Sequence, residues 1–355
     1  MLDKDDLRAA VQSGLISEAQ AVNLTSLAQS RAGSRQGLNP GDEPFELFKG
    51  FNEIFIVVGL GILATGWIFL NVAAVESEVV NYRSMISVIG LVAAVVIWLL
   101  SEYFVRRRRM VAPAIALSVL FAANAGIGLA GYFAQPFMLA REDFSSLPLP
   151  LALATLATFI YWWRFKVPFA MAMIAVALFG LGMVVAANSA GTPSEVGDLF
   201  LLSAGGPFAW ITLVLGLIVF GVALNFDMSD PHRVTRRSAQ GFWLHVVAAP
   251  ALVNTIAATL LDRGTSGAYL ALIAVLAVFA LVAIVIDRRS FLIAAIGYIV
   301  ALAGTVFDGD GAATTILVLG IVLLALGAFW ERIRAVLLRM MPAFVPIDRL
   351  PPSYS

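Results

Sequence analysis

The residues best placed for chemistry are four that interrupt the long apolar runs of this chain. Asn124 and Asn254 lie near the centres of two such runs. Pro250 lies one turn before Asn254, and His245 lies about one turn inside the same run. An amide in hydrocarbon needs a hydrogen-bond partner, which is another helix, water or a ligand. Proline removes a backbone donor and frees a carbonyl one turn earlier, here that of Val246. These four residues are the candidate substrate-binding residues.

Each candidate has two interpretations. The amides of Asn124 and Asn254 either join neighbouring helices or form a polar pair that lines a substrate cavity. His245 is either a hydrogen-bonded histidine near the membrane surface or a group that handles protons. No Asp, Glu, Lys or Arg lies in the middle of any predicted span, although ion-coupled transporters generally place ionisable groups there. A solute handled here is therefore expected to be neutral or lipidic.

Composition excludes most other chemistry. The chain has 355 residues, of which 60% are hydrophobic and 13% charged, and its mean hydropathy is +0.91. A soluble domain cannot cover so much apolar mass with so little polar surface. The absence of cysteine excludes disulfides and thiolate sites, two histidines leave little for a metal centre, and no catalytic motif is present. A net charge of zero gives no field for nucleic acid. We expect a non-enzymatic protein with no cofactor, no metal and no nucleic-acid partner.

The apolar runs predict an all-α, polytopic membrane helix bundle. A helix needs about 20 apolar residues to cross a bilayer core of roughly 30 Å. Ten segments meet this requirement, of which the fourth and ninth are short: 51–73, 84–104, 111–134, 147–163, 168–189, 206–226, 241–261, 267–286, 291–307 and 312–330. Small residues at four-residue spacing, such as Ala122, Gly126 and Ala130, indicate close contacts between helices.

Arginine and lysine predict the orientation of the spans. If both termini are cytoplasmic, all of the 23 Lys and Arg residues except Arg83, Arg141 and Arg263 fall on the cytoplasmic side. Such asymmetry is the positive-inside rule, and the alternation holds across every loop. The sequence thus predicts both termini inside, in the inner membrane of a bacterium.

The predicted spans set the domain organisation. Residues 1–32 predict a cytoplasmic helical hairpin, in which Gly14 ends the first helix and Ser17 with Gln20 forms a capping box for the second. Residues 33–49 form a linker and 50–331 the ten-helix domain. Similar placement of basic loops and asparagines suggests a parallel repeat of 84–189 and 206–307. Residues 332–355 form an interfacial, cytoplasmic tail.

The N-terminal part also resembles a known family. The segment VQSGLISEAQ at 11–20, followed after a linker by GLGILATG at 59–66, resembles the DUF2157-type predicted membrane proteins of bacteria. The resemblance implies a helical hairpin ahead of many spans. It brings neither an activity nor site residues.

Two functional classes follow from these patterns. The first is a permease-like protein for a neutral or lipidic solute. The second is a membrane scaffold or sensor whose N-terminal hairpin docks a partner, because a hairpin of about 30 residues cannot bury enough surface alone. The expected partners are the lipid bilayer, a protein for the hairpin and a second copy of the chain.

Overall fold

A computed structural model describes residues 4–18, 20, 21, 23, 24, 27, 51–77, 82–136, 138–141, 143–233, 235–291, 310–342 and 345–351. Helices dominate these residues, and no strand occurs among them. The all-helical class predicted from the apolar runs is therefore confirmed.

The described residues form long α-helices and a few short helical turns. The helices are α1 (Lys4–Gln12), α3 (Phe51–Ser77), α4 (Tyr82–Ser101), α5 (Ala112–Phe133), α6 (Met138–Arg141), α7 (Pro148–Phe165), α8 (Pro168–Ala190), α9 (Phe208–Ser229), α10 (Arg236–Asp262), α11 (Ser266–Val285) and α13 (Asp310–Met340). A π-helical turn, η1 (Glu102–Arg107), extends α4, and short 3-10 turns are η2 (Val196–Leu199), η3 (Leu202–Ala204) and η4 (Ile347–Arg349).

Seven helices within the described residues are long and apolar enough to cross a membrane: α3, α4 with η1, α5, α8, α9, α10 and α11. The chain is therefore a helical membrane protein. The predicted span 147–163 coincides with α7, which has 18 residues and is not among the seven. The predicted span 312–330 lies within α13, whose backbone departs from helical geometry at Phe329. All of the ninth predicted span, 291–307, except its first residue, and with it the end of the suggested repeat, lies outside the described residues, as does the linker 33–49.

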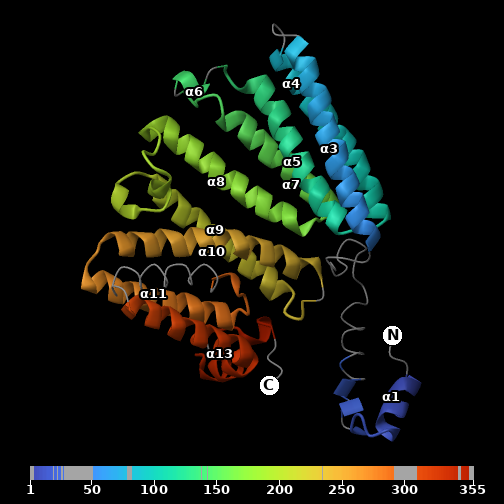
Figure 1. Cartoon of the computed structure of the whole chain (residues 1–355), viewed down its shortest axis with the longest axis vertical. Coiled ribbons are helices and arrows are strands. Elements are labelled where there is room, and N and C mark those ends of the chain that lie inside the picture. Colours follow the sequence, from blue (N-terminus) through green and yellow to red (C-terminus); the bar gives the residue numbers. More distant parts are fainter. Residues whose placement is uncertain are drawn as a thin grey trace.

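The helices pack in an order close to that of the sequence, from α3 and α4 through α8 to α11 and α13 (Figure 1). The most extensive pairings are α4 with α5 and α10 with α9, and α8 contacts both groups. One buried core lies among α3, α4, α5 and α7 and includes Leu117, Phe121 and Tyr161. A second lies among α9, α10 and α11 and includes Leu252, Leu272 and Phe291.

Basic loops gather at one end of the bundle, which we call the basic end. The Arg164 guanidinium at the end of α7 binds Glu102 of η1, and Arg236 at the start of α10 donates to the carbonyl of Phe165. Glu53 at the start of α3 accepts hydrogen bonds from the backbone N–H groups of Val111 and Ala112, where α5 begins. The consecutive helices α3, α4 and α5 thus alternate in direction.

A glycine seam joins α4 and α5. A Cβ added to Gly90 would lie 2.7 Å from the backbone nitrogen of Gly128, so the two backbones approach closely only because both residues are glycine. Ser87 Oγ donates to the Gly128 carbonyl at 2.7 Å. The predicted contact through Gly126 is wrong, because a Cβ there would meet nothing within 4 Å. The contact runs through Gly128, which lies about 200° around α5 from Gly126, on the nearly opposite face.

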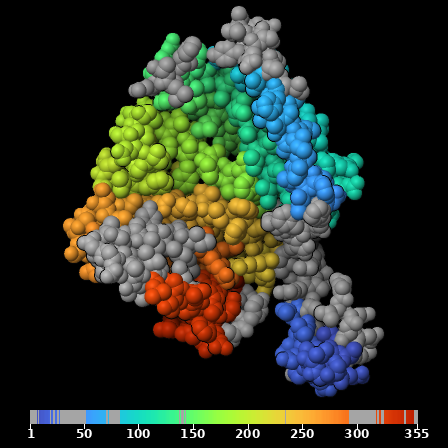
Figure 2. Space-filling view, viewed as in Figure 1, coloured from blue at the N-terminus to red at the C-terminus, as the bar shows by residue number. Residues whose placement is uncertain are grey.

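The N-terminal helix lies apart from the bundle. Gly14 has a φ of +72° and follows α1 directly. The predicted capping box is present, since Ser17 N donates to Gln20 Oε1 at 2.9 Å and Gln20 N donates to Ser17 Oγ at 3.2 Å. Figure 2 shows the deep-blue atoms of this region separated from those of the helical bundle.

Gly90→Ala should lower the stability of the protein, because the added methyl group forces two helix backbones apart. We expect a loss of about 1–3 kcal/mol in the free energy of unfolding. Gly126→Ala makes the same change on the open face of α5 and is the matched control. Thermal unfolding in detergent, followed by tryptophan fluorescence, measures both variants. Equal midpoints for the two would contradict the seam.

Candidate functional site

An apolar pocket lies between α3, α4 and α5 and encloses about 180 Å³. Aliphatic side chains form most of its wall, and among the lining residues that the structure describes, Trp67 of α3 and Asn124 of α5 have polar side-chain atoms. An apolar cavity of about 150 Å³ in another protein is large enough to bind benzene. This pocket therefore has room for a small apolar molecule or a segment of an acyl chain.

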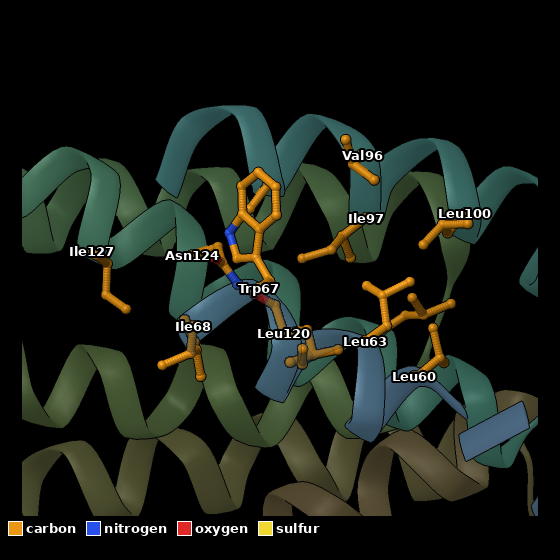
Figure 3. Close-up of a pocket in the computed structure, with 14 residues that line it drawn as sticks. Leu60, Leu63, Trp67, Ile68, Val96, Ile97, Leu100, Leu120, Asn124 and Ile127 are labelled. Carbon is orange, nitrogen blue, oxygen red and sulfur yellow. Dashed lines mark hydrogen bonds between the residues drawn. The ribbon is translucent and has the colours of Figure 1, made fainter. Parts of the chain in front are cut away.

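Trp67 and Asn124 lie beside each other in the pocket, with Ile68 and Ile127 toward one end (Figure 3). Leu60, Leu63 and Leu100 occupy the other end in this view. Asn124 Nδ2 donates a hydrogen bond to the carbonyl of Leu120 in its own helix at 2.8 Å. A primary amide has a second N–H and a carbonyl oxygen for further partners. The pocket thus combines an apolar wall with one amide near the middle of α5.

The structure does not bring the two predicted asparagines together. Asn254 is half-buried on α10 and is not among the residues that line the pocket. Pro250 lies within an uninterrupted α10, on its exposed side. Its neighbours Ala249 and Ala251 are buried, which is consistent with a proline tolerated in a packed membrane helix.

His245 belongs to a different site, a buried ionic cluster at the basic end. His245 is fully buried, and its Nε2 lies 2.9 Å from Asp227 Oδ2. The Arg288 guanidinium binds the same carboxylate through two nitrogens, with its Nε 3.0 Å from Oδ2. Arg288 also donates to the carbonyl of Ser238 at 2.9 Å. The cluster therefore ties together α9, α10 and the segment after α11.

Hydrogen bonding indicates how charge is balanced in this cluster. A carboxylate only accepts, so Nε2 of His245 carries the hydrogen in its bond to Asp227. Within the described part of the chain, Nδ1 of His245 is buried without a hydrogen-bond partner. A second N–H at Nδ1 would be an unsatisfied buried donor, which favours the neutral ring. Asp227 and Arg288 then compensate each other.

A glycine at the contact between α9 and α10 leaves room for the Asp227 carboxylate. A Cβ added to Gly241 would lie 2.5 Å from Asp227 Oδ1 and 3.2 Å from the carbonyl of Ala223. Glycine at this position lets α10 approach α9 while the aspartate lies between them. The His245 ring packs edge-on against Phe220 and Phe291, with centroids 5.5 and 6.0 Å away.

A second layer of contacts surrounds the cluster. Arg233 and Asp287 form an ion pair at 2.8 Å, and Trp330 Nε1 donates to Asp287 at 2.7 Å. Burial, together with the neighbouring Arg288, lowers the pKa of Arg233, while Asp287 opposes this effect. The buried Arg334 binds the carbonyls of Ile284 and Pro351. Through these bonds the C-terminal segment packs against the end of α11.

Sequence reasoning missed Asp227 and Arg288. The predicted span ended at residue 226, so the carboxylate was assigned to a loop, and Arg288 was counted only as a topology signal. Two features of the sequence could have suggested the pairing. Asp227 and His245 lie near the adjoining ends of consecutive predicted spans, and positive-inside counting places Arg288 at the same end.

The fold and these two sites define a polytopic helical membrane protein. No family model matches the chain, and no similar protein was found among curated proteins or solved structures.

Asp227→Asn should strongly destabilise the protein, because it leaves the charge of Arg288 buried without compensation. Breaking a buried pair in this way costs about 3–5 kcal/mol in the free energy of unfolding. Asp262→Asn, at an exposed carboxylate that accepts from Ser203, should change it by less than about 0.5 kcal/mol. Denaturant unfolding in mixed micelles measures both.

The double variant Asp227→Asn with Arg288→Gln tests the coupling. It should lose less stability than the sum of the two single variants, by about 0.5–3 kcal/mol. Additive losses would show that the two side chains do not depend on each other.

Proposed function

We propose that this chain is a non-enzymatic, permease-like protein that handles a neutral or lipidic solute. The observation that carries the proposal is the pocket between α3, α4 and α5. The part of its wall that the structure describes is aliphatic except for Trp67 and Asn124. A neutral molecule with an apolar body and one hydrogen-bonding group matches this lining, whereas a charged solute would lose its hydration without compensation.

The proposal includes a topology. It places ten spans in the inner membrane of a bacterium, with both termini in the cytoplasm. The gathering of basic loops at one end of the described bundle supports this orientation, because cytoplasmic loops of membrane proteins are rich in arginine. Membership of the DUF2157-type proteins stays a prediction that rests on the N-terminal segments.

Photolabelling tests the pocket. Protein in nanodiscs is irradiated with a diazirine-bearing fatty alcohol, and the modified peptides are identified by mass spectrometry. Labelling should fall on α3, α4 and α5. Ala123→Phe fills the pocket and should reduce this labelling to background, whereas Gly126→Phe adds the same ring to an open face of α5 and should preserve it. Equal labelling of both variants would contradict the pocket as the binding site.

Transport requires a separate measurement. Proteoliposomes that carry a fluorescent neutral lipid in both leaflets are treated with dithionite, which bleaches only the outer leaflet. The protein should speed exchange between leaflets, and Ala123→Phe should abolish the gain. If exchange is no faster than in protein-free vesicles, the protein does not move this class of lipid between leaflets. Whether such a molecule binds in the pocket is then decided by the labelling experiment alone.

A scaffold or sensor role is the second candidate, and exposed leucines in the N-terminal region favour it. Leu15 and Leu24 are 79% and 46% exposed, and α1 lies apart from the bundle. Exposed apolar side chains on a small unit are typical of a docking surface.

Leu15→Asp combined with Leu24→Asp should abolish recovery of a docked partner in a pull-down from crosslinked native membranes. The reason is that two charges cannot be buried at an apolar interface. Gln12→Asp, at an exposed polar position, is the control and should leave recovery unchanged. If the double variant recovers the same partner as the unaltered chain, the leucines do not form a docking surface.

A further inference from the structure

A second apolar depression lies on another face of the α4–α5 pair, in the groove between α4 and α7. Its volume is about 520 Å³, it is largely open to the outside, and residues of α4, α5 and α7 line it. Leu91, Val95 and Leu99 project along one side, and Leu156 and Ile160 along the other, all between 42% and 64% exposed. From Leu91 to Leu99 an α-helix rises about 12 Å. This length is close to half of a hydrocarbon core of roughly 30 Å.

The groove closes at the basic end. Ser101 Oγ and Tyr161 Oη lie 2.8 Å apart across α4 and α7, and the ring of Trp98 packs edge-on against Tyr161 and Phe165. Among the lining residues of the groove that the structure describes, Trp98, beside this closure, is the one with a polar side-chain atom. An apolar chain that lies in the groove would therefore have its polar end at the closure.

Two arginines share one carboxylate beyond this closure. Arg164 binds both oxygens of Glu102, at 2.8 and 3.1 Å, and Arg106 binds one of them at 3.2 Å. The three side chains are 41%, 31% and 48% exposed in that order. Their summed charge is positive, and each guanidinium has five N–H groups, so donors remain for a further anion.

We propose that this groove is a binding site for an anionic phospholipid of the leaflet at the basic end. One acyl chain lies between α4 and α7, and the phosphate accepts hydrogen bonds from Arg106 and Arg164. Guanidinium groups fit phosphate oxygens in geometry and charge. Lys166 adds a cation nearby, with its Nζ 4.4 Å from the ring centroid of Trp162. The site is separate from the pocket of the proposed function, which lies on a different face of α4.

Substitutions at Glu102 and at the two arginines test the proposal, because they should change lipid binding in opposite directions. In the free protein its carboxylate competes with a phosphate for both arginines. Glu102→Gln should therefore strengthen the preference for anionic lipid, while Arg106→Gln with Arg164→Gln should weaken it. A basic residue near a membrane surface contributes about fivefold in binding to anionic lipid, so the double variant should lose more than fivefold.

Native mass spectrometry provides the measurement. The full chain is released from nanodiscs that contain equal amounts of phosphatidylglycerol and phosphatidylcholine of the same acyl chains, and retained lipids are counted. The unaltered protein should retain phosphatidylglycerol preferentially. Arg141→Gln with Arg263→Gln removes two exposed arginines, one at the end of α6 and one directly after α10, and should leave that preference unchanged. Inorganic phosphate in excess should not displace the lipid, because it has no acyl chain.

Ala157→Phe, which fills the groove, tests the acyl-chain contact and should reduce retention of phosphatidylglycerol. Unchanged retention in this variant would overturn the groove as the site. An equal loss in the Arg141 and Arg263 control would overturn the assignment to Arg106 and Arg164. If the arginine double variant fails to fold, Glu102→Gln serves as the test. The proposal is overturned if Glu102→Gln does not increase the preference for phosphatidylglycerol. The Ala123→Phe variant keeps this site intact, so the outcome is independent of the proposed function.

Discussion

A carboxylate excluded from water must be compensated, and in this protein that constraint fixes how the last helices meet. Asp227 is 4% exposed at the end of α9. It is held by the guanidinium of Arg288 and the imidazole of His245, which come from the segment after α11 and from α10. A charge in such a place is costly unless each of its lone pairs has a partner. The geometry of α9, α10 and α11 at the basic end therefore has little freedom.

The two helix groups are held by different physics. Around Asp227, directional hydrogen bonds fix the arrangement and extend outward to Asp287 and Trp330. In the group of α3, α4, α5 and α7, by contrast, close apolar packing forms the core, and hydrogen bonds such as those of Ser87 and Ser101 join the helices at single points. Gly90 and Gly128 bring two backbones together, and aromatic rings such as Trp98 and Tyr161 fill the space near the basic end. A hydrocarbon solvent gives helices no hydrophobic reason to associate, so small residues and polar bonds do this work.

Much of the fold could be predicted from the sequence because a bilayer demands long apolar helices with charged ends. The predicted spans 84–104, 168–189 and 267–286 begin and end within three residues of α4, α8 and α11. The Ser17–Gln20 capping box was also predictable, because it depends on residues three apart. Which side of each helix contacts a neighbouring helix was not predictable in the same way. Gly126 and Gly128 are both glycines of α5, so the residue type does not distinguish them. Only the position of the partner helix α4 decides which of them lies in the seam.

The candidate sites show the same limit. Hydropathy ends a span at its first charge, so Asp227 was assigned outside the bundle although tertiary contacts bury it. The amides of Asn124 and Asn254 look equivalent along the sequence, yet one lines a pocket and the other lies on a helix of the second core. Periodicity describes one helix at a time. A site formed by three helices depends on their rotations, which single-helix patterns do not contain.

The pocket and the groove share the α4–α5 pair as a common wall. Ala93, Val96 and Ile97 face the pocket, while Ala94, Val95 and Trp98 face the groove, so consecutive residues of one helix serve two sites. The glycine seam holds α4 closely against α5, so the relative position of the two helices that line both hollows has little freedom. The aliphatic side chains on the two sides of α4 can therefore differ in what they contact while the backbone of the pair stays the same.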